Sequence, residues 1–174
     1  MSEKSKLLLK TSRFRVVEHT LQAGDGQSVV HRQVIEHPGS VAIIPLLEGN
    51  RVCLIRNYRI AVKKTLIELP AGTIEPPDSP SETAIRELKE ETGFEAQSWQ
   101  ELPSFYLSPG ILRERMHLFV AENLTVGSTA REAGEDIENL IVPWEDAVAM
   151  AMRGEIEDAK TLVGILSWDR VRGS

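Results

Sequence analysis

The chain has 174 residues, of which 41% are hydrophobic and 26% are charged, and its formal net charge is −6 with a pI near 5.3. This composition is ordinary for one folded domain of about 100–200 residues and excludes a disordered or collagen-like chain. The negative charge argues against general nucleic-acid binding, and no stretch approaches the roughly 20 apolar residues of a membrane span. The single cysteine, Cys53, cannot form an internal disulfide, so we expect a reducing, cytoplasmic location.

The N-terminal part of the chain is expected to be rich in β-structure. Residues 14–21 and 28–35 contain many strand-forming side chains and flank a glycine-containing turn, which predicts a hairpin. His37-Pro38-Gly39 then interrupts the pattern. We therefore expect an N-terminal β subdomain over residues 1–38 and a second domain over residues 39–174.

The second domain is expected to mix strands and helices. Residues 41–47 and 51–56 are almost continuously apolar, which is typical of strands covered on both faces. Three further strands are expected over residues 99–107, 116–121 and 137–142. Three helices are expected over residues 81–92, 143–152 and 158–170. Strands with helices inserted between them favour an α/β or α+β sandwich.

Three glutamates share one face of the helix expected over residues 81–92. At 3.6 residues per turn, Glu91 lies about 40° to one side of Glu87 and Glu90 about 60° to the other. Like charges at these spacings destabilise an isolated helix by about 0.2–0.5 kcal/mol per pair, and a divalent cation would offset the repulsion. A solvated acidic surface is the alternative. The adjacent face of the same helix is expected to be buried, and it consists of Ala84, Ile85, Leu88 and Thr92.

A longer pattern decides between these alternatives. It runs Gly72, five residues, Asp78, seven residues, and then Arg86-Glu87-Leu88-Lys89-Glu90-Glu91-Thr92-Gly93-Phe94. This resembles the Nudix box, Gly-x5-Glu-x7-Arg-Glu-U-x-Glu-Glu-x-Gly-U, where U is a bulky aliphatic or aromatic residue. Only Asp78 departs from the fixed positions, keeping the charge of glutamate with one methylene less. The resemblance implies a Nudix fold, an α/β/α sandwich around a mixed sheet.

The resemblance also implies a metal site and its ligands. Glu87, Glu90 and Glu91, with the backbone carbonyl of Ala71, would bind Mg²⁺, or Mn²⁺ as an alternative. Mg²⁺ takes hard oxygen ligands and keeps waters that diphosphate oxygens can replace. Such an ion would polarise a P–O bond and position an attacking water. Glu90 and Arg86 are the expected catalytic residues of the box, with Arg86 orienting the carboxylates.

Segments outside the box resemble the ADP-ribose and sugar-nucleotide pyrophosphatase branch of the family. They are Leu54-Ile55-Arg56-Asn57-Tyr58-Arg59, the run from Ile67 to Gly72, and Ser108-Pro109-Gly110. Pro109 lies fifteen residues beyond Phe94, where dinucleoside-polyphosphate hydrolases tend to have a tyrosine. The substrate-binding residues implied by this resemblance are Arg56, Arg59, Glu68, Pro109 and Glu114.

Two of these assignments have alternatives. A guanidinium matches phosphate oxygens in pairs, but Arg56 and Arg59 need not share a face of their strand, so one could be a surface charge. Glu68 would accept hydrogen bonds from a substrate sugar or form an ordinary salt bridge. Phe14 and Tyr58 are candidate aromatic platforms for adenine, although both residue types are common in cores.

The catalytic base is expected in an acidic loop over residues 131–138. The family pattern favours Glu135, which would deprotonate water or ligate a further metal ion, and Glu132 is the second choice. Glu138 would point outward from the following strand. A solvated acidic loop without a catalytic role is the alternative.

The expected reaction is Mg²⁺-dependent hydrolysis of ADP-ribose to AMP and ribose 5-phosphate. The alternatives are GDP-mannose or another sugar nucleotide as substrate, or a nucleotide-sensing domain that does not cleave. The retained carboxylates of the box argue against the last. In the family the N-terminal segment commonly crosses to a partner subunit, which implies a homodimer. The expected ligand is a small molecule, and neither nucleic acid nor a membrane is expected as a partner.

Overall fold

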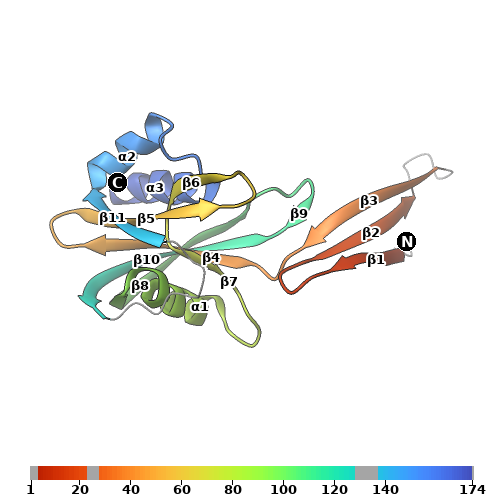
Figure 1. Cartoon of the computed structure of the whole chain (residues 1–174), viewed down its shortest axis with the longest axis horizontal. Helices are drawn as coiled ribbons and strands as arrows, with labels where there is room; N and C mark the ends of the chain where they lie inside the picture. The colour runs from red at the N-terminus through yellow and green to blue at the C-terminus, as the bar shows by residue number, and fades with distance from the viewer. Residues whose placement is uncertain (1–3, 23–27, 128–136, 174) are drawn as a thin grey trace.

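A seven-stranded mixed sheet forms the centre of the computed structural model, which describes residues 4–22, 28–127 and 137–173 (Figure 1). The strand order is β11-β5-β4-β10-β8, with β6 paired to β5 and β7 paired to β4. β4 and β10 run parallel, and the other pairs in this sheet are antiparallel. The strands are β4 (Ser40–Leu47), β5 (Arg51–Arg59), β6 (Lys64–Glu68), β7 (Ala71–Thr73), β8 (Phe94–Tyr106), β10 (Arg115–Val126) and β11 (Ile137–Pro143).

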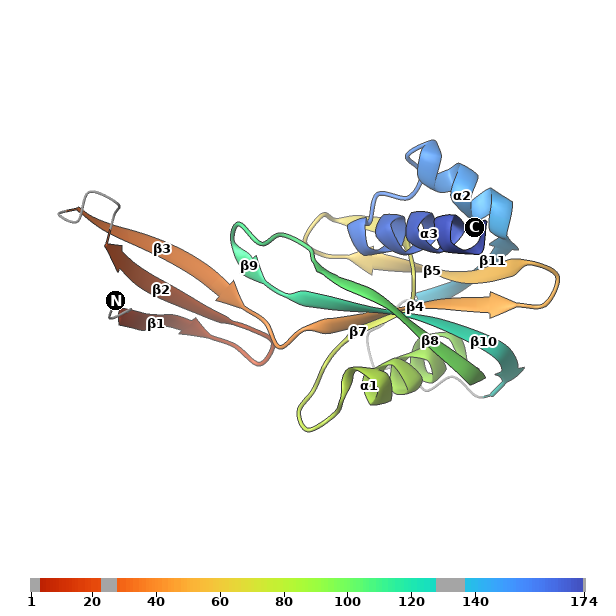
Figure 2. The same cartoon turned by 180° about the vertical axis from the view of Figure 1, so that it is seen from behind.

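Helices cover both faces of this sheet. Helix α1 (Pro80–Glu87) lies on one face, and helices α2 (Trp144–Met152) and α3 (Ala159–Arg172) lie on the other (Figure 2). Because side chains alternate along a strand, Ile43 packs in the α1 layer with Leu88, whereas Ile44 packs in the α2/α3 layer with Trp144 and Ile165. The expected α/β/α sandwich is confirmed. Within the described ranges, no helix has the length and apolar character needed to cross a bilayer.

A second sheet carries the N-terminal strands and projects from the rest of the molecule (Figures 1 and 2). β2 (Arg15–Gln22) and β3 (Val29–Glu36) form the expected hairpin, whose turn lies outside the described residues. Sequence analysis did not separate the flanking strand β1 (Lys4–Lys10). The short strand β9 (Leu112–Arg113) pairs with β3 and links this sheet to the remainder of the chain.

The helix that carries the glutamates differs in detail from the prediction. It begins at Pro80, in the first turn, where a proline loses no hydrogen bond. Ser79 caps it through a reciprocal pair of hydrogen bonds with Glu82. From Leu88–Thr92 the chain forms a π-helical turn, which ends as predicted at Gly93, with a φ of 77°.

Ile85 contradicts the expected buried stripe of this helix, because it is 54% exposed. Ala84 and Leu88 are fully buried against the sheet. A residue advances about 100° around a helix, so Ile85 lies at the edge of the face that Ala84 presents to the sheet. The buried stripe is therefore narrower than the sequence predicts.

Candidate active site

The acidic face of the helix meets strand β7, and the contact fixes the carboxylate of Glu91. Ala71 pairs with Ala42 of β4 on one side, and its N–H donates a 2.8 Å hydrogen bond to Oε2 of Glu91. Glu91 is only 3% exposed, which is unusual for a glutamate and differs from the solvated acidic surface that is the alternative prediction. The π-helical turn and β7 together enclose this side chain, so its carboxylate has one defined position.

The side chain of Glu87 occupies the space where a Cβ at position 72 would lie. A Cβ added to Gly72 would lie 1.9 Å from Oε1 of Glu87 and 2.0 Å from its Cδ. Real Cβ atoms do not approach other atoms this closely, and the contact is with the carboxylate itself. A side chain at position 72 would therefore displace the carboxylate of Glu87, and glycine at this position lets that carboxylate lie where it does.

Arg86 lies among the carboxylates of the box. Its Nη1 donates a 2.6 Å hydrogen bond to Oε2 of Glu90, and its Nη2 is 3.0 Å from Oε1 of Glu87. Asp78, the residue that departs from the box, keeps a longer contact of 3.9 Å with Nε of Arg86. Burial lowers the pKa of Arg86, but the negative charges of Glu87 and Glu90 outweigh it and raise the pKa above its usual value. Arg86 is thus a permanent cation between two carboxylates.

These side chains line a cavity of about 510 Å³. Asn57 and Arg59 of β5 line the same cavity, as do Ser12 and Arg13 from the turn between β1 and β2. The remaining lining residues are Pro38, Ala71, Gly72, Thr73, Ile74, Glu75, Pro76, Arg86, Glu87, Glu90 and Glu91. One cavity therefore joins a carboxylate wall to a guanidinium.

The donor atoms of the carboxylate wall fit a hard divalent cation. Glu87, Glu90 and Glu91 supply carboxylate oxygens beside the backbone of Ala71, and Mg²⁺ prefers such ligands together with water. In the part of the chain that is described, no three acidic, histidine or cysteine side chains already converge as a metal cluster. For all three glutamates to bind one metal ion, Arg86 would have to break some of its ion pairs with Glu87 and Glu90.

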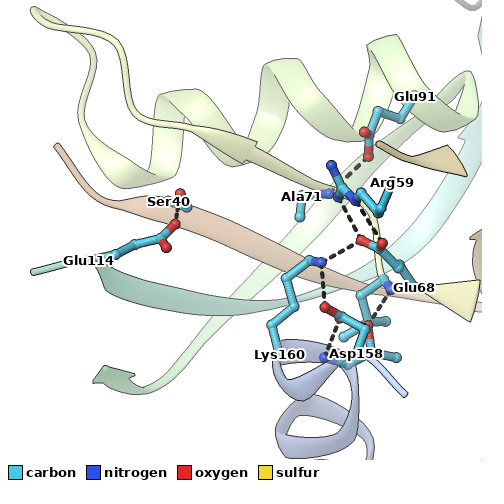
Figure 3. A network of polar contacts seen from close by, with 10 residues as sticks. Ser40, Arg59, Glu68, Ala71, Glu91, Glu114, Asp158 and Lys160 are labelled. Carbon is cyan, nitrogen blue, oxygen red and sulfur yellow. Dashed lines mark hydrogen bonds and ion pairs between the residues drawn. The ribbon is translucent and has the colours of Figure 1, made fainter. Parts of the chain in front are cut away.

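Arg59, which lines the same cavity, is held by the buried carboxylate of Glu68 and lies beside Ala71 and Glu91 (Figure 3). Its Nε and Nη2 donate hydrogen bonds of 2.7 and 2.6 Å to the two oxygens of Glu68, whose side chain is 1% exposed. Lys160 also donates to Glu68. Burial alone would raise the pKa of Glu68, but the hydrogen bonds and charges of Arg59 and Lys160 lower it below its usual value. Glu68 is thus a charged member of a salt bridge.

The other predicted substrate residues are distributed around this cavity. Arg56 is exposed, and strand alternation places it on the opposite face of β5 from Arg59. Glu114 accepts a 2.6 Å hydrogen bond from Ser40 and lines an adjoining cavity of about 190 Å³ that also contains Arg59. Pro109 lines a separate cavity of about 530 Å³ between the N-terminal sheet and the chain that precedes β9.

The predicted bases Glu135 and Glu132 lie outside the described residues. The site therefore brings together Arg86, Glu87, Glu90 and Glu91, all from one helix, with Ala71. Comparison with known proteins places this arrangement in a family.

A model of the NUDIX domain matches residues 36–163. The chain belongs to the Nudix family. It is 38% identical over 136 residues to a protein of Bacillus subtilis named "ADP-ribose pyrophosphatase", covering 77% of this chain and 74% of the relative. It is 33% identical over 158 residues to "GDP-mannose pyrophosphatase" of Escherichia coli, covering 84% of this chain and 82% of the relative.

A solved structure entitled "Crystal structure of ADP compounds hydrolase" superposes on this Nudix chain with a TM-score of 0.82. The superposition covers 98% of this chain and 94% of the other, at 22% sequence identity. At that identity the likeness shows the fold. The membership and the relatives together identify a Nudix hydrolase.

Several residues that line the two adjoining cavities of this Nudix hydrolase were not predicted from its sequence. Asn57 lies two residues before Arg59 in one strand, and the alternation of side chains could have placed both on one face. Ser12 and Arg13 come from a distant turn, and no spacing in the sequence relates them to the box. Lys160 and Asp158 flank the start of α3, where Asp158 reads as a helix cap.

Proposed function

We propose that this hydrolase cleaves the diphosphate of ADP-ribose with Mg²⁺, giving AMP and ribose 5-phosphate. The observation that carries the proposal is the single cavity that Glu87, Glu90 and Glu91 line together with Arg59. Such a cavity can take a metal-bound diphosphate between opposite charges. The name of the Bacillus subtilis relative supports ADP-ribose, and that of the Escherichia coli relative supports GDP-mannose as the second candidate.

Each residue of the cavity has a distinct part in the proposed reaction. Glu87, Glu90, Glu91 and the Ala71 carbonyl would hold Mg²⁺, which when bound neutralises the diphosphate and lowers the pKa of water. Arg59 donates hydrogen bonds to a diphosphate oxygen and orients the substrate. The water oxygen forms a new bond to one phosphorus, the bridging P–O bond breaks, and each product leaves with one phosphate.

The remaining predicted residues complete the proposed substrate site. Glu68 acts through Arg59, whereas Glu114 lies close enough to reach a ligand that extends into the adjoining cavity. Arg56 and Pro109 are outside the carboxylate cavity, so contact with either requires the substrate to extend beyond it. Arg86 is proposed to orient the carboxylates, as its contacts with Glu87 and Glu90 support.

A substrate panel with product identification tests the proposed function. We expect the highest kcat/KM for ADP-ribose, compared with GDP-mannose, diadenosine polyphosphates and nucleoside triphosphates, all with Mg²⁺. Chromatography should identify AMP and ribose 5-phosphate. A clear preference for GDP-mannose would move the assignment to that substrate. Tight binding of a nucleotide with no cleavage of any compound would instead indicate a sensing domain.

We propose Glu135 as the catalytic base, on the strength of its place in the family pattern. Glu135→Gln keeps the size of the side chain but removes its ability to accept a proton, so kcat should fall by about 10²–10⁴-fold. KM should change little, because a base acts mainly in the transition state. Steady-state kinetics of Glu132→Gln provide the matched control. Loss of activity in Glu132→Gln alone would reassign the base, and full activity in both variants would exclude this loop.

We propose that residues 1–38 form a dimerisation subdomain and that the enzyme is a homodimer of the cytoplasm. The support is the projecting sheet, in which Leu7, Leu8 and Leu9 are about half exposed. The buried thiol of Cys53 agrees with a reducing compartment. Sedimentation should give a dimer for the wild-type chain and a monomer for Leu7→Glu combined with Leu9→Glu. A monomeric wild-type protein would contradict the proposal.

A further inference from the structure

A buried lysine lies behind the guanidinium of the cavity. The side chain of Lys160 is 8% exposed and belongs to the first turn of α3. Its Nζ is 2.5 Å from Oε2 of Glu68 and 3.0 Å from Oδ1 of Asp158. A buried ammonium is costly unless it is paired and hydrogen-bonded. Lys160 meets that condition through two carboxylates, one from α3 and one from β6.

The cap of α3 fixes the position of this lysine. Oδ2 of Asp158 accepts hydrogen bonds from the backbone N and the hydroxyl of Thr161, at 3.0 and 2.5 Å. The same hydroxyl accepts a 2.8 Å bond from the N–H of Leu69, the residue that follows Glu68. Both carboxylates around Lys160 are therefore attached to the segment that leads into the box. The lysine has little freedom to move relative to Glu68.

Charge alternates along the row Arg59, Glu68, Lys160 and Asp158, which Figure 3 shows running from the cavity to α3. Without Lys160, the buried carboxylate of Glu68 would face Arg59 as its single cationic partner within this row. Glu68 would then largely neutralise the positive charge of Arg59. Because Lys160 also pairs with Glu68, the group formed by Arg59, Glu68 and Lys160 has a net positive charge, and Arg59 can attract a second anion.

Arg59 is placed to use that charge. Its side chain is 41% exposed and lines the cavity that contains Glu87 and Glu91. Glu68 engages Nε and Nη2, so the Nη1 side of the guanidinium is directed away from that carboxylate. A guanidinium held along one edge presents its other donors in a fixed plane, and that geometry suits pairs of phosphate oxygens.

We propose that Lys160 is a positioning residue for the substrate diphosphate. By pairing with Glu68 from outside the carboxylate cavity, it keeps Arg59 in the orientation and with the net charge that a diphosphate requires. The inference rests on the proposed function, because it assumes that the ligand of Arg59 is a nucleoside diphosphate sugar. Lys160 lines the adjoining cavity of about 190 Å³ and not the carboxylate cavity, and in this proposal it acts on the diphosphate through Glu68 and Arg59.

The test measures KM and kcat for Lys160→Met and Lys160→Arg. Loss of a hydrogen-bonding partner behind a metal ligand typically changes affinity or activity by about 10–100-fold, and by analogy we expect KM for ADP-ribose to rise about 10-fold in Lys160→Met. The kcat should change much less, because substrate binding is what is lost. Lys160→Arg retains the charge and should recover most of the affinity. The same order should appear when the dissociation constant of α,β-methylene ADP-ribose is measured calorimetrically with Mg²⁺.

Two control variants separate positioning from general stability. Met150→Ala removes a buried side chain of α2 and keeps every contact of the row, so its melting temperature should fall while KM stays near the wild-type value. Lys64→Met removes an exposed ion pair with Glu157 and should change neither. An equal rise of KM in Met150→Ala and Lys160→Met would show that the lysine is merely structural.

A double variant checks that the effect passes through Glu68. If Lys160 acts by neutralising this carboxylate, adding Lys160→Met to Glu68→Gln should raise KM no further than Glu68→Gln alone. Additive effects would overturn the proposal. Failure of the proposed substrate is distinguishable, because wild-type enzyme would then neither cleave ADP-ribose nor bind its analogue. An active wild type with an unchanged Lys160→Met variant would reject this inference alone.

Discussion

Excess EDTA is expected to abolish hydrolysis of ADP-ribose completely, and added Mg²⁺ should restore it. Glu87, Glu90 and Glu91 line one wall of the cavity, and Arg86 is the cation placed among them. A diphosphate entering without a metal ion would bring two further negative charges to that wall. Product formation should be measured after chelation and again after Mg²⁺ or Mn²⁺ is returned in excess.

The chelated protein should remain folded. The carboxylates have partners within the chain, since Glu91 accepts from Ala71 and Glu90 accepts from Arg86. The melting temperature with EDTA should therefore lie close to that of the untreated protein. Full activity in excess EDTA would contradict the proposed metal site, whereas unfolding in EDTA would show that a metal ion is required for the fold.

Glu91→Gln should lower kcat by about 10³-fold. A carboxylate that ligates Mg²⁺ helps to stabilise charge in the transition state, a contribution of several kcal/mol, and each 1.36 kcal/mol corresponds to a factor of ten. The amide keeps one oxygen that can accept the N–H of Ala71, so the local contact survives. Steady-state kinetics at saturating Mg²⁺ measure the change.

An exposed glutamate near the same helix provides the control. Glu95 is half exposed and forms a 2.6 Å ion pair with Lys89, so Glu95→Gln should leave kcat unchanged. The melting temperature of Glu91→Gln in EDTA should equal or slightly exceed that of wild type, because one like-charge repulsion with Glu87 is removed. A large fall of that temperature would indicate a structural carboxylate, and near-normal turnover would remove Glu91 from the metal site.

Much of the fold could be predicted because its signals are local. The apolar runs around Ile43 and Leu54 correspond to β4 and β5, whose central side chains are fully buried as expected. Gly93 ends the glutamate helix with a positive φ, as a glycine after such a helix usually does. The spacing of the box predicts that Glu87 and Glu91 lie together, and both line the same cavity.

The parts that could not be predicted depend on tertiary contacts. The burial of Glu91 arises from β7, a strand of three residues whose short sequence has no strand pattern of its own. Alternation along β5 separates Arg56 from Arg59, but choosing between them requires knowing which face meets the cavity. The role of Lys160 depends on Glu68, and the two residues lie 92 positions apart in the chain.

The central sheet divides the interior into two sets of side chains that share no members, and this bears on how the enzyme could be made more heat-resistant. Ile43 and Ile44 are consecutive, yet one packs beside Leu88 under the glutamate helix and the other beside Trp144. Free-energy changes from substitutions without common partners usually add. Substitutions around Met150 on α2 can therefore raise stability without displacing the glutamates. Substitutions beside Leu88 would change both the stability and the kcat of the enzyme.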